Sequence, residues 1–200
     1  MARDRDVDAF DRRASGYESG LIGKLHEDIV NRTIRIAVTI APDAQRVLDV
    51  GCGTGYLLRQ IARQLPGAVD LAGIYAAPRM VEVARATLPA DPRLRFSTGF
   101  AERLPYPAGS FDVVVSTTSF DHWADQRAGL AECARVLTPG GHLVLTDLFS
   151  LWLAPTLVAG HRGRARTVRR ASRLLTTAGF RSLRWHPTYT LVLRTVIATS

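Results

Sequence analysis

The stretch Val47–Gly55, which reads VLDVGCGTG, constrains the fold of this chain more than any other part. Small apolar residues and one acid lead directly into glycines at alternate positions. This pattern predicts a buried strand that ends in a tight turn and opens a helix, as in nucleotide-type binding folds. A dinucleotide-binding turn separates its second and third glycines by three positions, and this turn does not. The carboxylate of Asp49 also favours a ligand with a cationic amino group over phosphates, which it would repel.

Periodicity and turn signals divide the rest of the chain into alternating strands and helices. Such alternation predicts an α/β fold with a parallel sheet that is covered on both faces. The expected strands are 46–50, 68–75, 94–98, 111–116 and 142–148, followed by a closing hairpin of 180–185 and 190–198 around Pro187. The expected helices are 21–40, 56–64, 78–86, 124–137 and 167–178.

Three blocks in this order resemble the small-molecule branch of the class I S-adenosylmethionine-dependent methyltransferases. They are Val47–Gly55, Leu104–Trp123 (LPYPAGSFDVVVSTTSFDHW) and Ala134–Phe149 (ARVLTPGGHLVLTDLF). The resemblance implies a Rossmann-like three-layer sandwich with a mostly parallel seven-stranded sheet and a C-terminal antiparallel hairpin. It further implies one domain over residues 1–200, in which 1–45 form an N-terminal helical cap and 46–200 form the core. Fold alone does not fix function.

The resemblance also implies S-adenosylmethionine as cofactor, with S-adenosylhomocysteine as its product. In an open α/β sheet the ligand lies beyond the carboxyl ends of the strands. The methionine part would lie against the glycine turn and the adenosine between the second and third strand ends, while an N-terminal segment folds over the site. The residues expected to bind the cofactor are Tyr17, Asp49, Gly51, Cys52, Gly53, Gly55, Tyr75, Ala76, Met80, Phe100, Ala101, Glu102 and Thr117.

Two positions depart from the pattern that the resemblance implies. An acid that binds the ribose hydroxyls is replaced by Tyr75, and an Asp that binds the adenine amino group is replaced by Phe100. Two lost charge-assisted hydrogen bonds of about 1.5–3 kcal/mol each would weaken binding roughly a hundredfold to ten-thousandfold. Either the rings flank the adenine and recover affinity by stacking, or they fill the cleft and abolish cofactor binding. Retained binding is favoured because Asp49 and the glycines remain.

Methyl transfer at a sulfonium is an in-line displacement, so the protein has to align the acceptor atom with the methyl–sulfur axis. An oxygen or nitrogen acceptor also needs a base for its proton. The first candidate catalytic residue is His122, which follows the fourth strand, because imidazole titrates near neutral pH. Asp121 would orient His122 or act in its place. The alternative is that His122 packs beside Trp123 and takes no part in chemistry.

The excess of positive charge is confined to the last quarter of the chain. The net charge is +8, and residues 151–200 hold nine arginines and no acid. This indicates either an anionic partner or substrate, or an arginine-rich composition without a binding role. Residues 148–173 place apolar side chains beside arginines. They would suit an amphiphilic or aromatic acid as acceptor, or would simply form an amphipathic helix with solvated arginines.

Composition and motifs argue against several other classes of protein. The charged N-terminus is not typical of a signal peptide, and the longest apolar stretch, 148–160, is too short to span a bilayer. The expected compartment is therefore the cytoplasm. Cys52 and Cys133 lie far apart and have no Cys or His at ligand spacing, which predicts neither a disulfide nor a metal site.

Three functions compete on this sequence. The leading hypothesis is methyl transfer to a small organic acceptor, on oxygen, nitrogen or carbon. The second is a protein of the same fold with weakened or lost cofactor binding, which serves as a partner subunit or catalyses a different reaction. RNA modification is disfavoured, because the chain shows no aromatic–basic interleaving and no appended RNA-binding module. The expected partner is a small molecule rather than nucleic acid, and a homodimer is left open.

Overall fold

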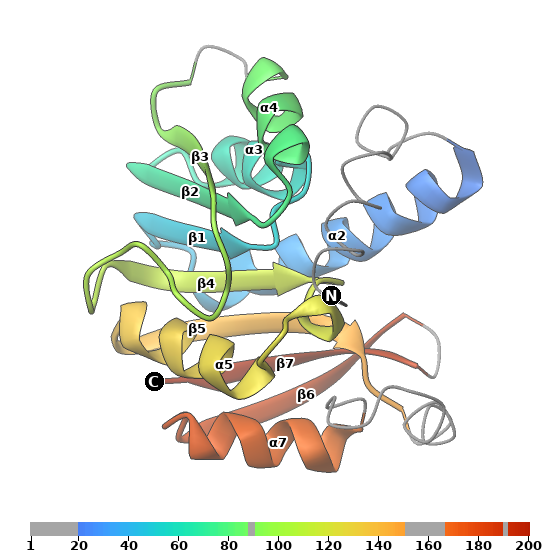
Figure 1. Ribbon diagram of the computed structural model, residues 1–200, viewed down its shortest axis with the longest axis vertical. Coiled ribbons are helices and arrows are strands. Elements are labelled where there is room, and N and C mark those ends of the chain that lie inside the picture. Colours follow the sequence, from blue (N-terminus) through green and yellow to red (C-terminus); the bar gives the residue numbers. More distant parts are fainter. Residues whose placement is uncertain (1–19, 88–90, 151–166, 190–191) are drawn as a thin grey trace.

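Seven strands form a single sheet in the order β3-β2-β1-β4-β5-β7-β6 (Figure 1). The computed structural model describes residues 20–87, 91–150, 167–189 and 192–200. The strands are β1 Arg46–Val50, β2 Asp70–Tyr75, β3 Leu94–Thr98, β4 Phe111–Thr117, β5 Leu137–Leu148, β6 Ser182–Tyr189 and β7 Leu193–Thr199. Strands β1 to β5 are parallel, and β7 is antiparallel to both of its neighbours.

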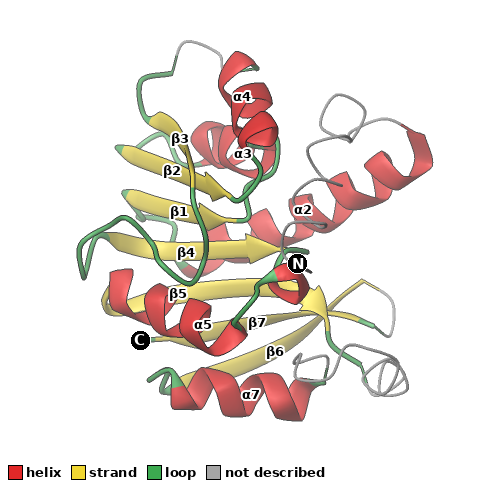
Figure 2. Ribbon diagram, in the orientation of Figure 1, coloured by secondary structure: helices red, strands yellow, loops and turns green. Residues whose placement is uncertain are grey.

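Helices cover both faces of this sheet (Figure 2). They are α2 Gly20–Ile40, α3 Tyr56–Gln64, α4 Pro78–Ala86, α5 Gln126–Val136, α7 Val168–Thr177 and the short 3-10 helix η1 Phe120–His122. Buried residues of α2, α3 and α4 share one apolar cluster with the sheet, and those of α5 and α7 share another. The three-layer α/β sandwich expected from the sequence is therefore confirmed.

The central strands are apolar throughout because both of their faces are covered. In β1, Val47 belongs to the cluster with α2, α3 and α4, whereas Leu48 belongs to the cluster with α5 and α7. In β4, Val113 and Val115 face the first cluster and Val114 the second. All five side chains are at most 2% exposed, as expected for a parallel sheet between two helical layers.

The sequence predicted most element boundaries correctly. Residues 46–50, 56–64, 78–86 and 94–98 have the bounds that were expected. Pro78 occupies the first turn of α4, where a missing N–H is harmless. The helix expected at 124–137 begins later, at Gln126, because Asp125 caps it by accepting hydrogen bonds from two backbone N–H groups.

Two expectations were wrong in detail. The fifth strand was expected to start at His142, but β5 starts at Leu137, so Gly140 and Gly141 lie inside the strand rather than in a loop before it. Pro187 was expected at the turn of the closing hairpin, but it lies within β6. A proline is tolerated there because β6 is the outermost strand and needs hydrogen bonds on one side only.

Helix α2 is held on the sheet by buried hydroxyl groups as well as by apolar contacts. Thr33 of α2 is hydrogen-bonded to Thr146 of β5 at 2.8 Å, and Thr146 is bonded to Thr195 of β7 at 2.6 Å. All three side chains are fully buried. These hydrogen bonds fix the position of α2 on the sheet, and they therefore also fix the position of the residues near the start of α2. Within the described ranges, no helix is long and apolar enough to cross a membrane.

Candidate functional site

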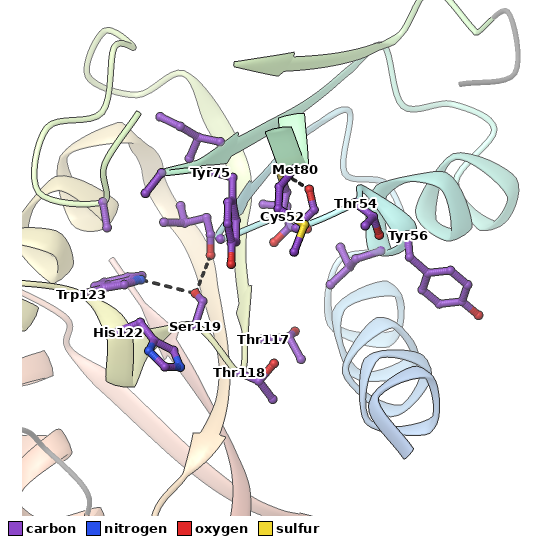
Figure 3. Close-up of a pocket in the computed structure, with 18 of the residues that line it drawn as sticks. Cys52, Thr54, Tyr56, Tyr75, Met80, Thr117, Thr118, Ser119, His122 and Trp123 are labelled. Carbon is purple, nitrogen blue, oxygen red and sulfur yellow. Dashed lines mark hydrogen bonds between the residues drawn. The ribbon is translucent and has the colours of Figure 1, made fainter. Parts of the chain in front are cut away.

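A pocket of about 240 Å³ lies at the carboxyl ends of the parallel strands, where an α/β sheet of this topology binds ligands (Figure 3). Its walls come from the ends of β1, β2 and β4, from the segment after β3, and from α2 and η1. In Figure 3, Cys52, Thr54 and Tyr56 lie on one side of this space. Thr117, Thr118 and His122 lie on another.

The turn after β1 brings the backbone close to the pocket. Gly51, Gly53 and Gly55 have φ angles of 89°, 52° and 83°, which side chains rarely adopt. A Cβ atom on Gly51 would lie 2.2 Å from Oγ of Ser119, so this glycine leaves room for the neighbouring strand end. A Cβ on Gly53 would meet no atom within 4 Å, and Gly53 lines the pocket. The backbone at Gly53 is therefore open to a ligand in the pocket.

Asp49 lines the same pocket from the end of β1, although its residue is only 2% exposed. Burial raises the pKa of its carboxyl group from 3.8 to about 8, because a carboxylate loses hydration energy in this position. Burial alone causes the shift, so no side chain in the described part of the protein compensates the charge of the ionised form. A cationic group on a ligand would supply that compensation.

Tyr75 and Phe100 both line the pocket and do not close it. Tyr75, at the end of β2, is partly buried, whereas 38% of Phe100 is exposed. The pocket wall around them is mostly apolar and includes Ala76, Met80 and Ala101. A planar ring system could therefore contact both aromatic side chains in the cavity that remains.

Hydrogen bonds between distant segments build the wall after β4. Ser119 Oγ donates to the carbonyl of Val50 at 3.0 Å, is bonded to Ser116 Oγ at 2.8 Å, and accepts from the indole N–H of Trp123 at 3.3 Å. These contacts connect the end of β1 to the start of η1. Thr117 lines the pocket beside them, and its buried Oγ1 has no hydrogen-bond partner among the residues that the structure describes.

The two candidate catalytic residues differ in position. His122, the last residue of η1, is exposed and lines the pocket. Asp121 is not among the lining residues, and its backbone N–H donates to Oδ2 of the buried Asp147 at 3.3 Å. Burial raises the pKa of Asp147 to about 6, against the lowering effects of the Leu148 and Asp121 N–H groups. Asp147 therefore anchors η1, a role that sequence reasoning missed.

Helix α2 contributes a second imidazole, that of His26, to the pocket wall. Nε2 of His26 lies 3.1 Å from Oγ1 of Thr118, and both residues line the pocket. Thr118 has a φ of 52°, the one positive value for a non-glycine residue in the described part of the chain. No sequence motif predicted the pair, since its members are 92 residues apart.

The structure thus brings most of the predicted site residues to one pocket. Those that line it are Asp49, Gly51, Cys52, Gly53, Tyr75, Ala76, Met80, Phe100, Ala101, Glu102, Thr117 and His122. Gly55 instead stands at the N-terminus of α3, where a Cβ would lie 2.5 Å from the ring of Phe96. Tyr17 and residues 151–166 of the expected apolar and basic lid lie outside the described residues.

Comparison with known proteins gives a consistent result. A family model described as a methyltransferase domain matches residues 48–145. A demethylmenaquinone methyltransferase of Deinococcus radiodurans is 39% identical over 132 residues, which cover 60% of this chain and 54% of that protein. The O-methyltransferase cnsE of Penicillium expansum is 38% identical over 125 residues, which cover 59% of this chain and 44% of that protein. The chain thus spans about half the length of these curated relatives.

Solved structures extend the likeness to nearly the whole fold. One solved structure is a complex of the Haloferax volcanii Trm112 methyltransferase activator with a methyltransferase. The matching chain of that complex superposes on this one with a TM-score of 0.78 at 23% identity, and the match covers 95% of this chain and 96% of that one. The glycine turn, the buried carboxylate beside it and the open pocket fit the cofactor of the matching family. Residues 48–145 match the methyltransferase domain family, and the fold around them is that of the class I S-adenosylmethionine-dependent methyltransferases.

Proposed function

We propose that this protein transfers a methyl group from S-adenosylmethionine to a small organic acceptor. The observation that carries the proposal is the pocket beside the glycine turn, lined by the buried carboxyl group of Asp49, which has no compensating cation among the described residues. The ligand's α-amino group would neutralise this charge in a site of low dielectric constant, where such a pair is much stronger than in water. When bound, the cofactor supplies an electrophilic methyl group on a sulfonium.

The residues of this chain would then divide the work of binding. Asp49 would hold the amino group, and the backbone at Gly53 would contact the methionine part. Tyr75 and Phe100 would stack on the adenine from the strand ends, in place of the charged contacts that they replace. This proposal keeps binding in spite of the two departures from the family pattern, and it is supported by the pocket that stays open with both rings in its wall.

The acceptor is proposed to be an uncharged or weakly acidic small molecule. Relatives of this chain include quinone-pathway methyltransferases and O-methyltransferases, so hydroxylated rings are the class to test first. Proton removal from such an acceptor requires a base at the wall after β4. Among the residues that the structure describes, His122 and His26 are the imidazoles that line the pocket.

Calorimetry with S-adenosylhomocysteine tests the proposal directly, because this product is stable and occupies the same site. We expect binding at micromolar to sub-millimolar concentration. Gly53→Ala would place a methyl group in the ligand's space and weaken binding by at least about fiftyfold. Its matched control is Gly109→Ala, which has a similar φ of 66° and equally open surroundings but lies outside the pocket.

The two glycine variants should lose similar stability, roughly 1 kcal/mol each, because both force a side chain into left-handed backbone. A difference in ligand affinity between the two variants would therefore come from contact with the ligand and not from a loss of stability. If the wild-type protein gives no heat of binding at millimolar S-adenosylhomocysteine, the chain is a scaffold that has lost the cofactor, and the proposed function is wrong.

A further inference from the structure

The wall after β4 contains a pair of groups that the proposed cofactor site does not use. Oγ1 of Thr118 and Nε2 of His26 are 3.1 Å apart, within hydrogen-bond distance, and both residues line the pocket. Figure 3 shows Thr118 between His122 and the ribbon of α2. A hydroxyl paired with an imidazole is an arrangement that can accept a proton from a bound ligand.

The backbone of Thr118 is held in an unusual conformation for this placement. Its φ of 52° lies in the left-handed region, which is unfavourable for a β-branched residue. The conformation persists because the Thr118 N–H donates to the carbonyl of Thr146 at 2.8 Å, while the side chain reaches His26. Strained backbone of this kind is concentrated at functional sites, where surrounding contacts enforce it.

His26 is also held firmly by its own helix. Seven residues further along α2, Thr33 is tied to Thr146 in the sheet, so the same strand β5 positions both members of the pair. Glu27, the acid next to His26, accepts a hydrogen bond from the hydroxyl of Tyr56 at 2.8 Å. Hydrogen bonds to β5 therefore hold both Thr118 and the helix that carries His26.

The side chains of the wall after β4 indicate which class of methyl acceptor the pocket would bind. The carboxyl group of Asp49 belongs to the β1 end of the pocket, whereas the wall after β4 offers hydroxyl and imidazole groups beside the indole of Trp123. Imidazoles do not attract a cationic amine, but they accept the proton of a phenolic hydroxyl group. Trp123 adds a ring surface against which an aromatic acceptor can pack.

We propose that Thr118 and His26 bind and deprotonate the hydroxyl group of an aromatic acceptor, a phenol or a hydroquinone. The acceptor O–H donates its proton to Oγ1 of Thr118 while Thr118 donates its own proton to Nε2 of His26. The acceptor keeps the electron pair as a phenolate, and His26 becomes an imidazolium. A phenolate is the reactive form for methylation at oxygen and at a ring carbon alike. This assignment rests on the proposed methyl transfer.

The test uses the full chain loaded with S-adenosylhomocysteine and 4-nitrocatechol as the probe, since the visible spectrum of this diol reports its ionisation. At a pH at which the free probe is mostly un-ionised, we expect the bound probe to show the phenolate spectrum. His26→Gln and Thr118→Val should each weaken binding by roughly tenfold or more and leave the bound probe un-ionised. Thr118→Ser should restore both properties.

The variants are chosen to keep the fold and the cofactor site intact. Thr118→Val retains the β-branch and the backbone strain and removes only the hydroxyl group. His186→Gln, an exposed imidazole on β6 outside the pocket, is the control for a general effect of losing a histidine. Affinity for S-adenosylhomocysteine, measured on every variant, should change by less than about twofold, because none of these groups is assigned to that ligand.

The outcomes separate this assignment from the proposed function. If S-adenosylhomocysteine binds but His26→Gln leaves the spectrum of the bound probe unchanged, the Thr118–His26 assignment is wrong and the methyl transfer stands. A loss of ionisation in His122→Gln in place of His26→Gln would make His122 the base and would overturn the assignment equally. Failure of the probe to bind the loaded protein also refutes it. If S-adenosylhomocysteine itself does not bind, both proposals fall.

Discussion

The two sides of the pocket are built in different ways. The wall after β1 is nearly continuous in sequence, since residues 49–54 all line the pocket and include the carboxyl group of Asp49 and the open backbone at Gly53. The wall after β4 is assembled across the fold, by hydrogen bonds that join Ser119 to the carbonyl of Val50 and Thr118 to His26. A short sequence motif therefore predicts the wall after β1. The wall after β4 forms only when α2 and β5 pack together.

Gly51→Ala tests how closely the two walls depend on each other, and it should have the largest effect. The new Cβ would overlap Oγ of Ser119, which three hydrogen bonds hold in place, and the residue would keep a φ of 89°. We expect a loss of about 3 kcal/mol or more in the free energy of unfolding, measured in urea. A loss below about 1 kcal/mol would show that the walls move independently.

The pH dependence of ligand affinity probes the β1 wall alone. In the unliganded protein the pKa of Asp49 is about 8, so its carboxyl group is mostly protonated below that pH. A cationic amino group requires the carboxylate. Affinity for S-adenosylhomocysteine should therefore rise with pH by up to about tenfold per unit towards pH 8, with proton release on binding. Calorimetry in buffers of different ionisation enthalpy measures that release, and its absence would remove Asp49 from the amino-group site.

Asp49→Asn should separate binding from stability in the same wall. The folded-state pKa is raised above the unfolded value of 3.8, so the folded protein retains a proton that the unfolded chain releases. Wild-type stability should therefore fall as the pH rises from about 4 to about 8, and the variant should avoid this loss. We expect Asp49→Asn to gain about 3–4 kcal/mol at neutral pH, which raises Tm by roughly 10 degrees, while ligand binding is lost. Equal stability of both proteins at pH 5 and pH 8 would contradict the shift.

Thr117→Val gives the smallest expected effect and concerns the β4 wall. The Thr117 hydroxyl is buried without a partner among the described residues, so its removal should increase the free energy of unfolding by about 0.5–1 kcal/mol. Thr146→Val is the contrasting variant, because that hydroxyl is hydrogen-bonded to both Thr33 and Thr195 and its loss should destabilise the protein by about 1–3 kcal/mol. Equal changes in the urea midpoints of the two variants would show that the hydrogen bonds of Thr146 to Thr33 and Thr195 do not stabilise the protein.

The difference between the walls also explains what could be read from the sequence. The bounds of β1 and α3 and the pocket position of Asp49 follow from local patterns, namely apolar runs, glycines and a proline at Pro66. Neither His26 nor Asp147 could be found in this way. His26 sits on a helix whose periodicity indicates only packing, and Asp147 looks like any acid at a strand end until burial and its bond to η1 are seen.

Pro187 has a consequence beyond its place in β6. This strand forms one border of the sheet, where unpaired backbone groups could recruit a strand from a second molecule. Proline lacks the N–H that such pairing requires, the register slips between Pro187 and Tyr189, and the exposed Arg184 on the same strand repels its own copy. The border is therefore unsuited to continuous β-augmentation.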